Sequence, residues 1–203
     1  MITIVDYGLG NLGSIFNMLK KLNVKSEIVS DPDKVALSTK ILLPGVGAFD
    51  AAMQKINHSG LLEILNQKAK VEKVPFLGIC LGMQLLTEGS EEGVLPGLSF
   101  IKGSTKKFSF ENPSLKIPHM GWNVVKLKNN SPLTKGMETE EQRFYFVHSY
   151  YVKCTNQDNV IGQTHYGFDF DCTIQDDNVF GVQFHPEKSH RFGMKLLKNF
   201  AAL

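Results

Sequence analysis

The sequence has little of what marks secreted, membrane-embedded or nucleic-acid-binding proteins. Its 203 residues include three cysteines, an odd number without regular spacing, which argues against a disulfide framework and fits a reducing cytosol. The 22 basic and 20 acidic residues leave a net charge of +2, which gives no electrostatic case for nucleic acid or an anionic membrane as partner. No apolar run approaches the roughly 18 residues of a membrane span. No signal peptide precedes the first predicted strand, and we expect a cytoplasmic protein.

The chain also lacks internal repeats, low-complexity tracts and linkers. A chain of this length can bury one sizeable core, so we expect a single domain over residues 1–203. No group of cysteines and histidines has the spacing of metal ligands, and we expect neither a metal nor another cofactor. Cys154 and Cys172 have no unusual surroundings in the sequence and are expected to be packing residues.

Hydrophobic patterning predicts an α/β fold with a mostly parallel, twisted sheet and helices on both faces. Predicted strands at 2–5, 25–29, 40–43 and 76–79 alternate with helical segments, which implies right-handed crossovers. After residue 97 short alternating stretches predict antiparallel additions at one sheet edge, at 106–110, 122–126, 144–148, 150–153, 160–165 and 168–174. A strand at 179–184 and a helix at about 190–202 complete the pattern.

The most informative motif joins a buried strand to a helix. Residues 76–79 form a short apolar run, and residues 78–82 read Gly-Ile-Cys-Leu-Gly. Glycines two residues before and after a nucleophile are typical of a nucleophile elbow, a strained turn in which a neighbouring Cβ would collide with strand or helix. The following helix N-terminus favours negative charge on the Cys80 sulfur. The alternative is a buried structural cysteine, which leaves the flanking glycines unexplained.

A second motif supplies the groups that a cysteine nucleophile needs. Residues 184–187 read Phe-His-Pro-Glu at the end of a predicted strand. Across the proline turn, Glu187 can reach one imidazole nitrogen of His185 while the other nitrogen faces Cys80. The alternative is that Glu187 caps the last helix beside an incidental histidine. Together with the elbow, the pair predicts a Cys80–His185–Glu187 triad.

These motifs resemble those of the class I (triad) glutamine amidotransferases. Within that family the closer resemblance is to the glutamine amidotransferase subunits of imidazole glycerol phosphate synthase. It extends nearly end to end, through residues 5–11, 43–49, 78–84, 117–123, 144–150 and 184–189. The order Cys, His, Glu also separates the chain from α/β-hydrolases, in which the acid precedes the histidine.

The resemblance implies a glutaminase that supplies ammonia to a separate partner. Cys80 would attack the side-chain amide of glutamine, and His185, oriented by Glu187, would move the proton. The implied partner is the barrel-shaped cyclase subunit, bound as a heterodimer in histidine biosynthesis. Asn11, Trp122 and Lys188 match positions implied to face that partner; without the resemblance, Trp122 would suit the core and Lys188 a solvated helix start.

Further residues are expected around the nucleophile. Acyl transfer requires N–H donors for the oxyanion; Leu81 follows the nucleophile, and the turn at Val46 and Gly47 ends a neighbouring strand. By resemblance this peptide reorients when the partner is occupied. Gln84, one turn beyond Cys80, could reach the substrate, or it could lie on the helix surface. Ser149 and Tyr150 match the family's glutamine-holding segment, although alone they could be ordinary strand residues. His119 and His148 are expected to be structural.

Two rival functions stay open from the sequence. Residues 8–13 satisfy the G-x-G-x-x-G pattern and Asp31 lies near the ribose-binding distance, which would suit a non-catalytic dinucleotide-binding module. The other rival keeps the glutaminase chemistry but changes the partner to an amidotransferase of bacterial surface-polysaccharide amidino sugars. Residues 189–193, Ser-His-Arg-Phe-Gly, resemble the surface-sugar copies more than the histidine-pathway ones.

Overall fold

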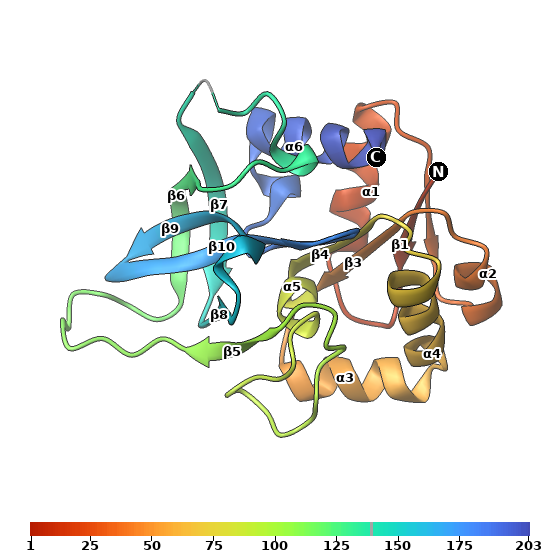
Figure 1. The fold of residues 1–203 in the computed structure, drawn as a ribbon, viewed down its shortest axis with the longest axis horizontal. Coiled ribbons are helices and arrows are strands. Elements are labelled where there is room, and N and C mark those ends of the chain that lie inside the picture. The colour runs from red at the N-terminus through yellow and green to blue at the C-terminus, as the bar shows by residue number, and fades with distance from the viewer. Residues whose placement is uncertain (139) are drawn as a thin grey trace.

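A computed structural model describes residues 1–138 and 140–203, and in it a central sheet organises the chain. Five parallel strands lie in the order β2-β1-β3-β4-β11 (Figure 1). Their bounds are β1 Ile2–Val5, β2 Ser26–Val29, β3 Ile41–Gly45, β4 Phe76–Cys80 and β11 Val179–Val182. These strands are short and mostly buried, as expected for a sheet covered on both faces. The predicted α/β fold is confirmed.

Helices cover both faces of the parallel strands. The helices are α1 Leu12–Lys21, α2 Pro32–Ala36, α3 Phe49–His58, α4 Leu61–Asn66, α5 Leu81–Leu85 and α6 His190–Ala202. Neighbouring side chains on a strand point to opposite faces, so Leu42 packs in the core with α1 and α6, and Leu43 in the core with α3 and α4. Figure 1 shows α1 and α6 above the sheet and α3 and α4 below it. No helix in the described ranges is long and apolar enough to cross a membrane.

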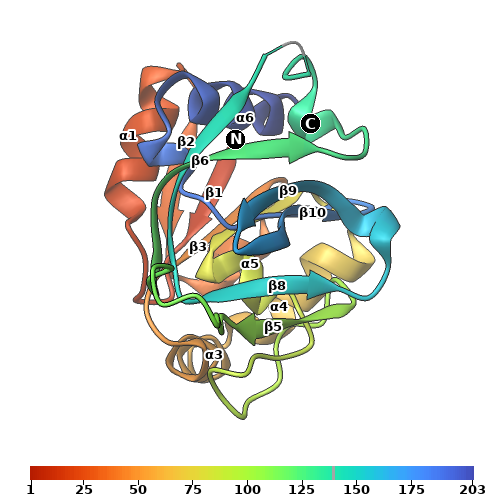
Figure 2. The same cartoon turned by 90° about the vertical axis from the view of Figure 1, so that its left-hand side faces the viewer.

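Antiparallel strands extend the sheet beyond β11, as predicted. They are β5 Gly103–Lys107, β6 His119–Leu127, β7 Gln142–His148, β8 Tyr150–Cys154, β9 Val160–Tyr166 and β10 Phe168–Asp176. The main path continues β11-β10-β9-β6-β7, while β8 pairs with both β10 and β5. The additions therefore branch at β10 instead of continuing as one flat edge. Figure 2 shows this branch, with β8 and β5 beside β9 and β10.

Several predicted strands begin or end one to three residues away from their observed bounds, including those predicted over 179–184 and 106–110. The strand predicted over 179–184 stops at Val182, because the chain then leaves the β4 ladder: the Gln183 N–H donates to Cys172 O and the His185 N–H donates to Tyr145 O, each at 2.9 Å. The strand predicted over 106–110 lies instead at Gly103–Lys107. Phe108, just beyond it, is buried among aromatic rings of β8 and β10.

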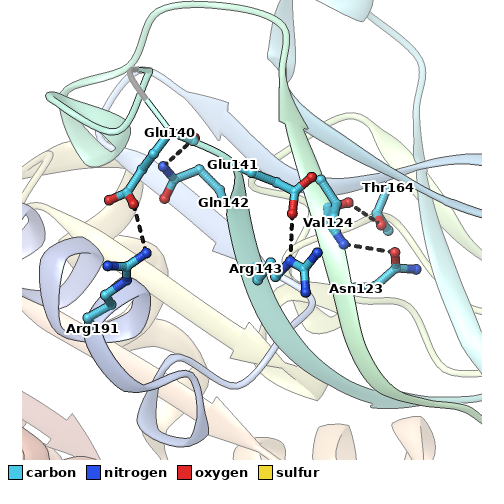
Figure 3. Close-up of polar contacts among 8 residues, drawn as sticks. All are labelled: Asn123, Val124, Glu140, Glu141, Gln142, Arg143, Thr164 and Arg191. Carbon is cyan, nitrogen blue, oxygen red and sulfur yellow. Dashed lines mark hydrogen bonds and ion pairs between the residues drawn. The ribbon is translucent and has the colours of Figure 1, made fainter.

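Side-chain contacts connect this antiparallel layer to the last helix (Figure 3). On α6, Arg191 pairs with Glu140 at 2.8 Å, just before β7. Within the layer, Thr164 of β9 donates to Val124 O of β6 at 2.6 Å. The Arg191 pair is exposed on both sides, so its contribution to stability is small, about 0–1 kcal/mol.

Candidate active site

The turn at Cys80 has the geometry of a nucleophile elbow. β4 ends at Cys80 and α5 begins at Leu81. Cys80 has φ 56° and ψ −113°, a positive-φ conformation that is strained for a residue with a Cβ. A Cβ on Gly78 would lie 2.6 Å from Gly82 O, and a Cβ on Gly82 would overlap Leu43 O. Both glycines are therefore required by backbone packing, as the sequence pattern predicts.

A pocket of about 360 Å³ opens above this turn. From the parallel strands and α5 it is lined by Val46, Gly47, Cys80, Leu81 and Gln84. From the antiparallel layer and the segment after β11 it is lined by Ser149, Tyr150, His185 and Lys188. Every residue predicted for the oxyanion and the substrate thus borders one pocket with Cys80. Glu187 lies behind His185, and Asn11 and Trp122 do not line the pocket.

His185 and Glu187 form a buried pair. The His185 Nδ1 lies 2.8 Å from Glu187 Oε1, and their side chains are 5% and 1% exposed. Burial lowers the pKa of His185, but the neighbouring Cys80 and Glu187 outweigh it and raise that pKa to about 10. Because Glu187 occupies Nδ1, only Nε2 can exchange a proton with Cys80, and Nε2 has no hydrogen-bond partner in the described ranges.

The backbone around His185 is anchored by Ser189, which the sequence did not single out as a site residue. Ser189 is fully buried. Its Oγ donates to His185 O at 2.6 Å and accepts from the Tyr145 N–H at 3.0 Å. The His185 N–H in turn donates to Tyr145 O. Strand β7 therefore holds the backbone from which the imidazole projects.

A second group of buried amides lies beside the nucleophile. Gln84 Nε2 donates to Tyr150 O at 3.2 Å and to Gln183 Oε1 at 3.0 Å. Gln183 Nε2 lies 3.8 Å from Cys80 Sγ. Sequence reasoning missed Gln183, although a polar residue in an apolar run is a signal, because a buried amide must find partners.

Two neutral histidines lie next to these amides. His148 Nδ1 is 2.7 Å from Tyr150 O, and its Nε2 is 2.9 Å from His119 Nδ1. Burial lowers the pKa of His148 to about 3 and that of His119 to about 4. Asn123 Nδ2 reaches His119 Nε2 at 3.1 Å. The pair supports the Tyr150 segment, and His148 also lines the pocket.

The Val46–Gly47 turn is open, unlike the elbow beside it. Gly45 pairs with Cys80 in the β3–β4 ladder, so the two turns are neighbours. Val46 is 40% exposed. Gly47 has φ +99°, and a Cβ there would meet no atom within 4 Å. The turn therefore has space for its peptide plane to rotate. Because Gly47 has no Cβ, this rotation costs little conformational energy.

One pocket carboxylate was absent from the sequence prediction. Glu92 lines the pocket and accepts a hydrogen bond from the Phe49 N–H at 2.9 Å. It lies outside the helices and strands, where hydrophobic periodicity gives no signal. Among the described residues that line the pocket, Glu92 is the one carboxylate and Lys188 the one amine.

The residues expected to face a partner are only partly brought together. Trp122 is 46% exposed and stacks on His190 with ring centroids 5.4 Å apart. Lys188 Nζ lies 5.7 Å from the Tyr145 ring centroid, and that ring is 6.3 Å from Trp122. Trp122 and Lys188 therefore share one surface beside the pocket. Asn11 is half-buried just before α1, which contacts the Pro186–Lys188 turn, but no hydrogen bond or ion pair of the described residues joins Asn11 itself to Trp122 or Lys188.

The glycine loop at residues 8–13 has local partners. The Gly8 N–H donates to Asp6 Oδ1 at 2.8 Å, and α1 follows from Leu12. Asp31 accepts from the Asp33 N–H at 3.0 Å and caps α2. The carboxylate that would bind a ribose is therefore engaged as a helix cap.

Comparison with known proteins agrees with this geometry. Residues 3–203 match the sequence model of the family described as glutamine amidotransferase class-I. The chain is 52% identical to imidazole glycerol phosphate synthase subunit HisH 2 of Methanococcus maripaludis, with 98% of both chains covered. It is 50% identical to subunit HisH of Bdellovibrio bacteriovorus, with both chains covered in full.

A solved structure shows the same fold at much lower identity. PurLQS from Thermotoga maritima matches with a TM-score of 0.76 at 22% identity, over 99% of this chain and 97% of that one. The resemblance read from the elbow and the His-Pro-Glu motif is confirmed. Because the family model matches nearly the whole chain, this chain belongs to the class I glutamine amidotransferases and is an enzyme of that family.

Proposed function

We propose that this chain is the glutaminase subunit of an imidazole glycerol phosphate synthase. It hydrolyses glutamine to glutamate and ammonia through Cys80, His185 and Glu187, and it passes ammonia to a cyclase subunit in histidine biosynthesis. The observation that carries the proposal is the joint geometry: a strained cysteine and a carboxylate-bound histidine border one pocket. The full-length similarity to HisH subunits supports the pathway.

The reaction uses each member of the triad in turn. His185 Nε2 takes the Cys80 proton, and the sulfur adds to the amide carbon of glutamine. The tetrahedral intermediate collapses as the protonated His185 delivers that proton to nitrogen, which releases ammonia and leaves a γ-glutamyl thioester. Water, deprotonated by His185, then hydrolyses the thioester to glutamate and restores the thiol. Glu187 holds the imidazole and compensates its positive charge.

The pocket offers separate partners for each polar group of glutamine. The Glu92 carboxylate complements the α-ammonium group, aided by Gln84, while Ser149 and Tyr150 face the α-carboxylate. The Leu81 N–H, at the start of α5, and an N–H of the Val46–Gly47 turn receive the oxyanion. The turn rotates into place when the partner is occupied, so isolated subunits hydrolyse glutamine slowly.

The chain works as a single domain in the cytoplasm, with the cyclase subunit bound beside the pocket. Trp122 and Lys188 provide the contact surface there, with Asn11 at the loop before α1. Direct delivery is needed because ammonia released into bulk water is protonated and loses its nucleophilicity. Met120 on β6 and Ile117 just before it are 61% and 43% exposed. They add apolar area to the surface near Trp122.

Cys80→Ala tests this function. The variant is expected to lose glutamine-dependent synthase activity while the complex still reacts with added ammonium salt, because Cys80 acts only in making ammonia. The matched control is Cys154→Ser, since Cys154 is buried in β8 and burial raises its pKa to about 12. Glutamine-driven turnover by Cys80→Ala would overturn the nucleophile assignment.

A second candidate is a glutaminase that serves a surface-sugar amidotransferase. Residues 189–193 suggested it, and His190 of that stretch stacks on Trp122 at the proposed partner surface. The relative in Methanococcus maripaludis carries the number 2 in its name, as does one in Pseudomonas aeruginosa. Expression in a host without its own glutaminase subunit decides: growth without histidine supports the synthase, and failure together with altered surface polysaccharide after deletion in the native host supports the rival.

A further inference from the structure

Gln183 is a buried polar residue beside the nucleophile. Its side chain is fully buried, and its backbone N–H is fixed to Cys172 O at 2.9 Å. Nε2 lies 3.8 Å from Cys80 Sγ, within the range of an N–H to sulfur hydrogen bond. The proposed triad mechanism gives this residue no task.

The orientation of the Gln183 amide is fixed from its far end. Tyr150 O can only accept a hydrogen bond, so the Gln84 side chain must point its NH₂ group toward it. The second hydrogen of that group then donates to Gln183 Oε1. With its oxygen occupied, Gln183 presents its own NH₂ group to the sulfur. A backbone carbonyl thus sets the direction of both amides.

We propose that Gln183 is a positioning residue that donates a hydrogen bond to the Cys80 thiolate and holds the sulfur toward the pocket. The inference rests on the proposed role of Cys80 as nucleophile. A neutral amide suits this task, because it stabilises negative charge without competing for the proton that His185 must carry. Titratable groups near the sulfur or bordering the same pocket are His185, Tyr7, His148, Tyr150, Glu92 and Lys188, with Glu187 bound to His185.

The same chain of amides connects the nucleophile to the substrate site. Both hydrogens of Gln84 Nε2 are used, by Tyr150 O and Gln183 Oε1. Gln84 borders the pocket, so only its oxygen is free to meet glutamine. Gln183 therefore positions two groups at once, the sulfur and the amide that meets the substrate.

The test is the pH dependence of Cys80 alkylation in the full-length chain. Iodoacetamide reacts with the thiolate, and mass spectrometry of the Cys80 peptide separates it from Cys154 and Cys172. Gln183→Met keeps similar volume but removes the donor, and we expect the alkylation midpoint to rise by about one pH unit. Gln183→Glu keeps the shape and brings a carboxylate to the sulfur, so its midpoint should rise at least as much.

Gln163→Met is the control, because Gln163 is a half-buried amide that donates to Asp171 Oδ1, away from the pocket. Its midpoint should match that of the parent. In steady-state glutamine hydrolysis, Gln183→Met should lower kcat about ten-fold, with a smaller change in KM. If Gln183→Met does not fold, the isosteric Gln183→Glu decides alone.

Unchanged midpoints in the folded Gln183 variants would overturn the inference, even with a working glutaminase. Failure of the proposed function would appear differently, as glutamine turnover that survives Cys80→Ala. The two results are independent, because alkylation requires neither glutamine nor a partner. A purely structural role for Gln183 would lower thermal stability and leave the midpoint in place.

Discussion

The pocket has two adjacent turns with opposite mechanical properties. Both end neighbouring parallel strands, and Gly45 of one pairs with Cys80 of the other. At the elbow a Cβ on Gly82 would overlap Leu43 O, whereas a Cβ on Gly47 would meet nothing within 4 Å. The elbow is held rigidly, and the Val46–Gly47 turn has room. The nucleophile is thus fixed in advance, while the peptide proposed to receive the oxyanion can change position.

Because the triad is fixed in advance, we expect substitutions in it to reduce catalysis more than substitutions in the Val46–Gly47 turn. His185→Ala should lower glutamine turnover by on the order of 10⁴-fold or more, because it removes the base. Glu187→Gln should cost about two orders of magnitude less, since the imidazole survives and keeps a hydrogen-bond partner. Steady-state hydrolysis by the complex measures both. Equal losses would mean that Glu187 does more than orient His185.

Rigidity of the elbow can be tested without an activity assay. Gly82→Ala should lower the free energy of unfolding by about 3 kcal/mol or more, because backbone atoms cannot move aside as a side chain can. Urea titration measures the change. Gly13→Ala in α1 is the matched control: a Cβ there meets no atom within 4 Å, and helix propensity should raise stability by roughly 0.5–1 kcal/mol. Parent-like stability of Gly82→Ala would refute the rigid elbow.

His148, which lines the same pocket, should make the stability of the protein depend on pH. Its pKa is lowered to about 3, so below the unfolded value of about 6.5 only the unfolded state takes up the proton, and stability falls as pH falls from there toward 3. Between pH 7.5 and pH 5 this group should cost about 2 kcal/mol. In urea unfolding, we expect the free energy of unfolding of His148→Gln to fall by about 2 kcal/mol less than that of the parent between these two pH values. An identical slope would contradict the buried neutral state.

The smallest effect is expected at the open turn. Gly47→Ala meets no collision but places an alanine at φ +99°, which should cost about 1–2 kcal/mol in the present conformation. Urea unfolding tests this value, and glutamine hydrolysis with and without the partner tests whether stimulation changes. A loss as large as that of Gly82→Ala would remove the distinction between the two turns.

Sequence alone predicted what depends on neighbours in the chain. The elbow could be predicted because its two glycines lie two positions on either side of Cys80, and the His185–Glu187 pair because its members lie two positions apart. Gln183 and Glu92 could not be placed, since Gln183 meets Gln84 only through folding and Glu92 lies outside regular structure. The strand end at Val182 was missed because Phe184 continues the apolar pattern after the backbone has left the ladder.

The hydrogen bond between the His185 N–H and Tyr145 O has a consequence for folding order. Strand β4, which carries Cys80, and its neighbour β3 come from the first half of the chain, whereas His185 is fixed by β7 from the second half. Gln183 and Cys80 are 103 positions apart, and closing such a separation is slow compared with forming helices or hairpins. Catalytic competence should therefore return last on refolding, after most secondary structure is in place, which leaves a folding chain without a reactive thiolate–imidazole pair.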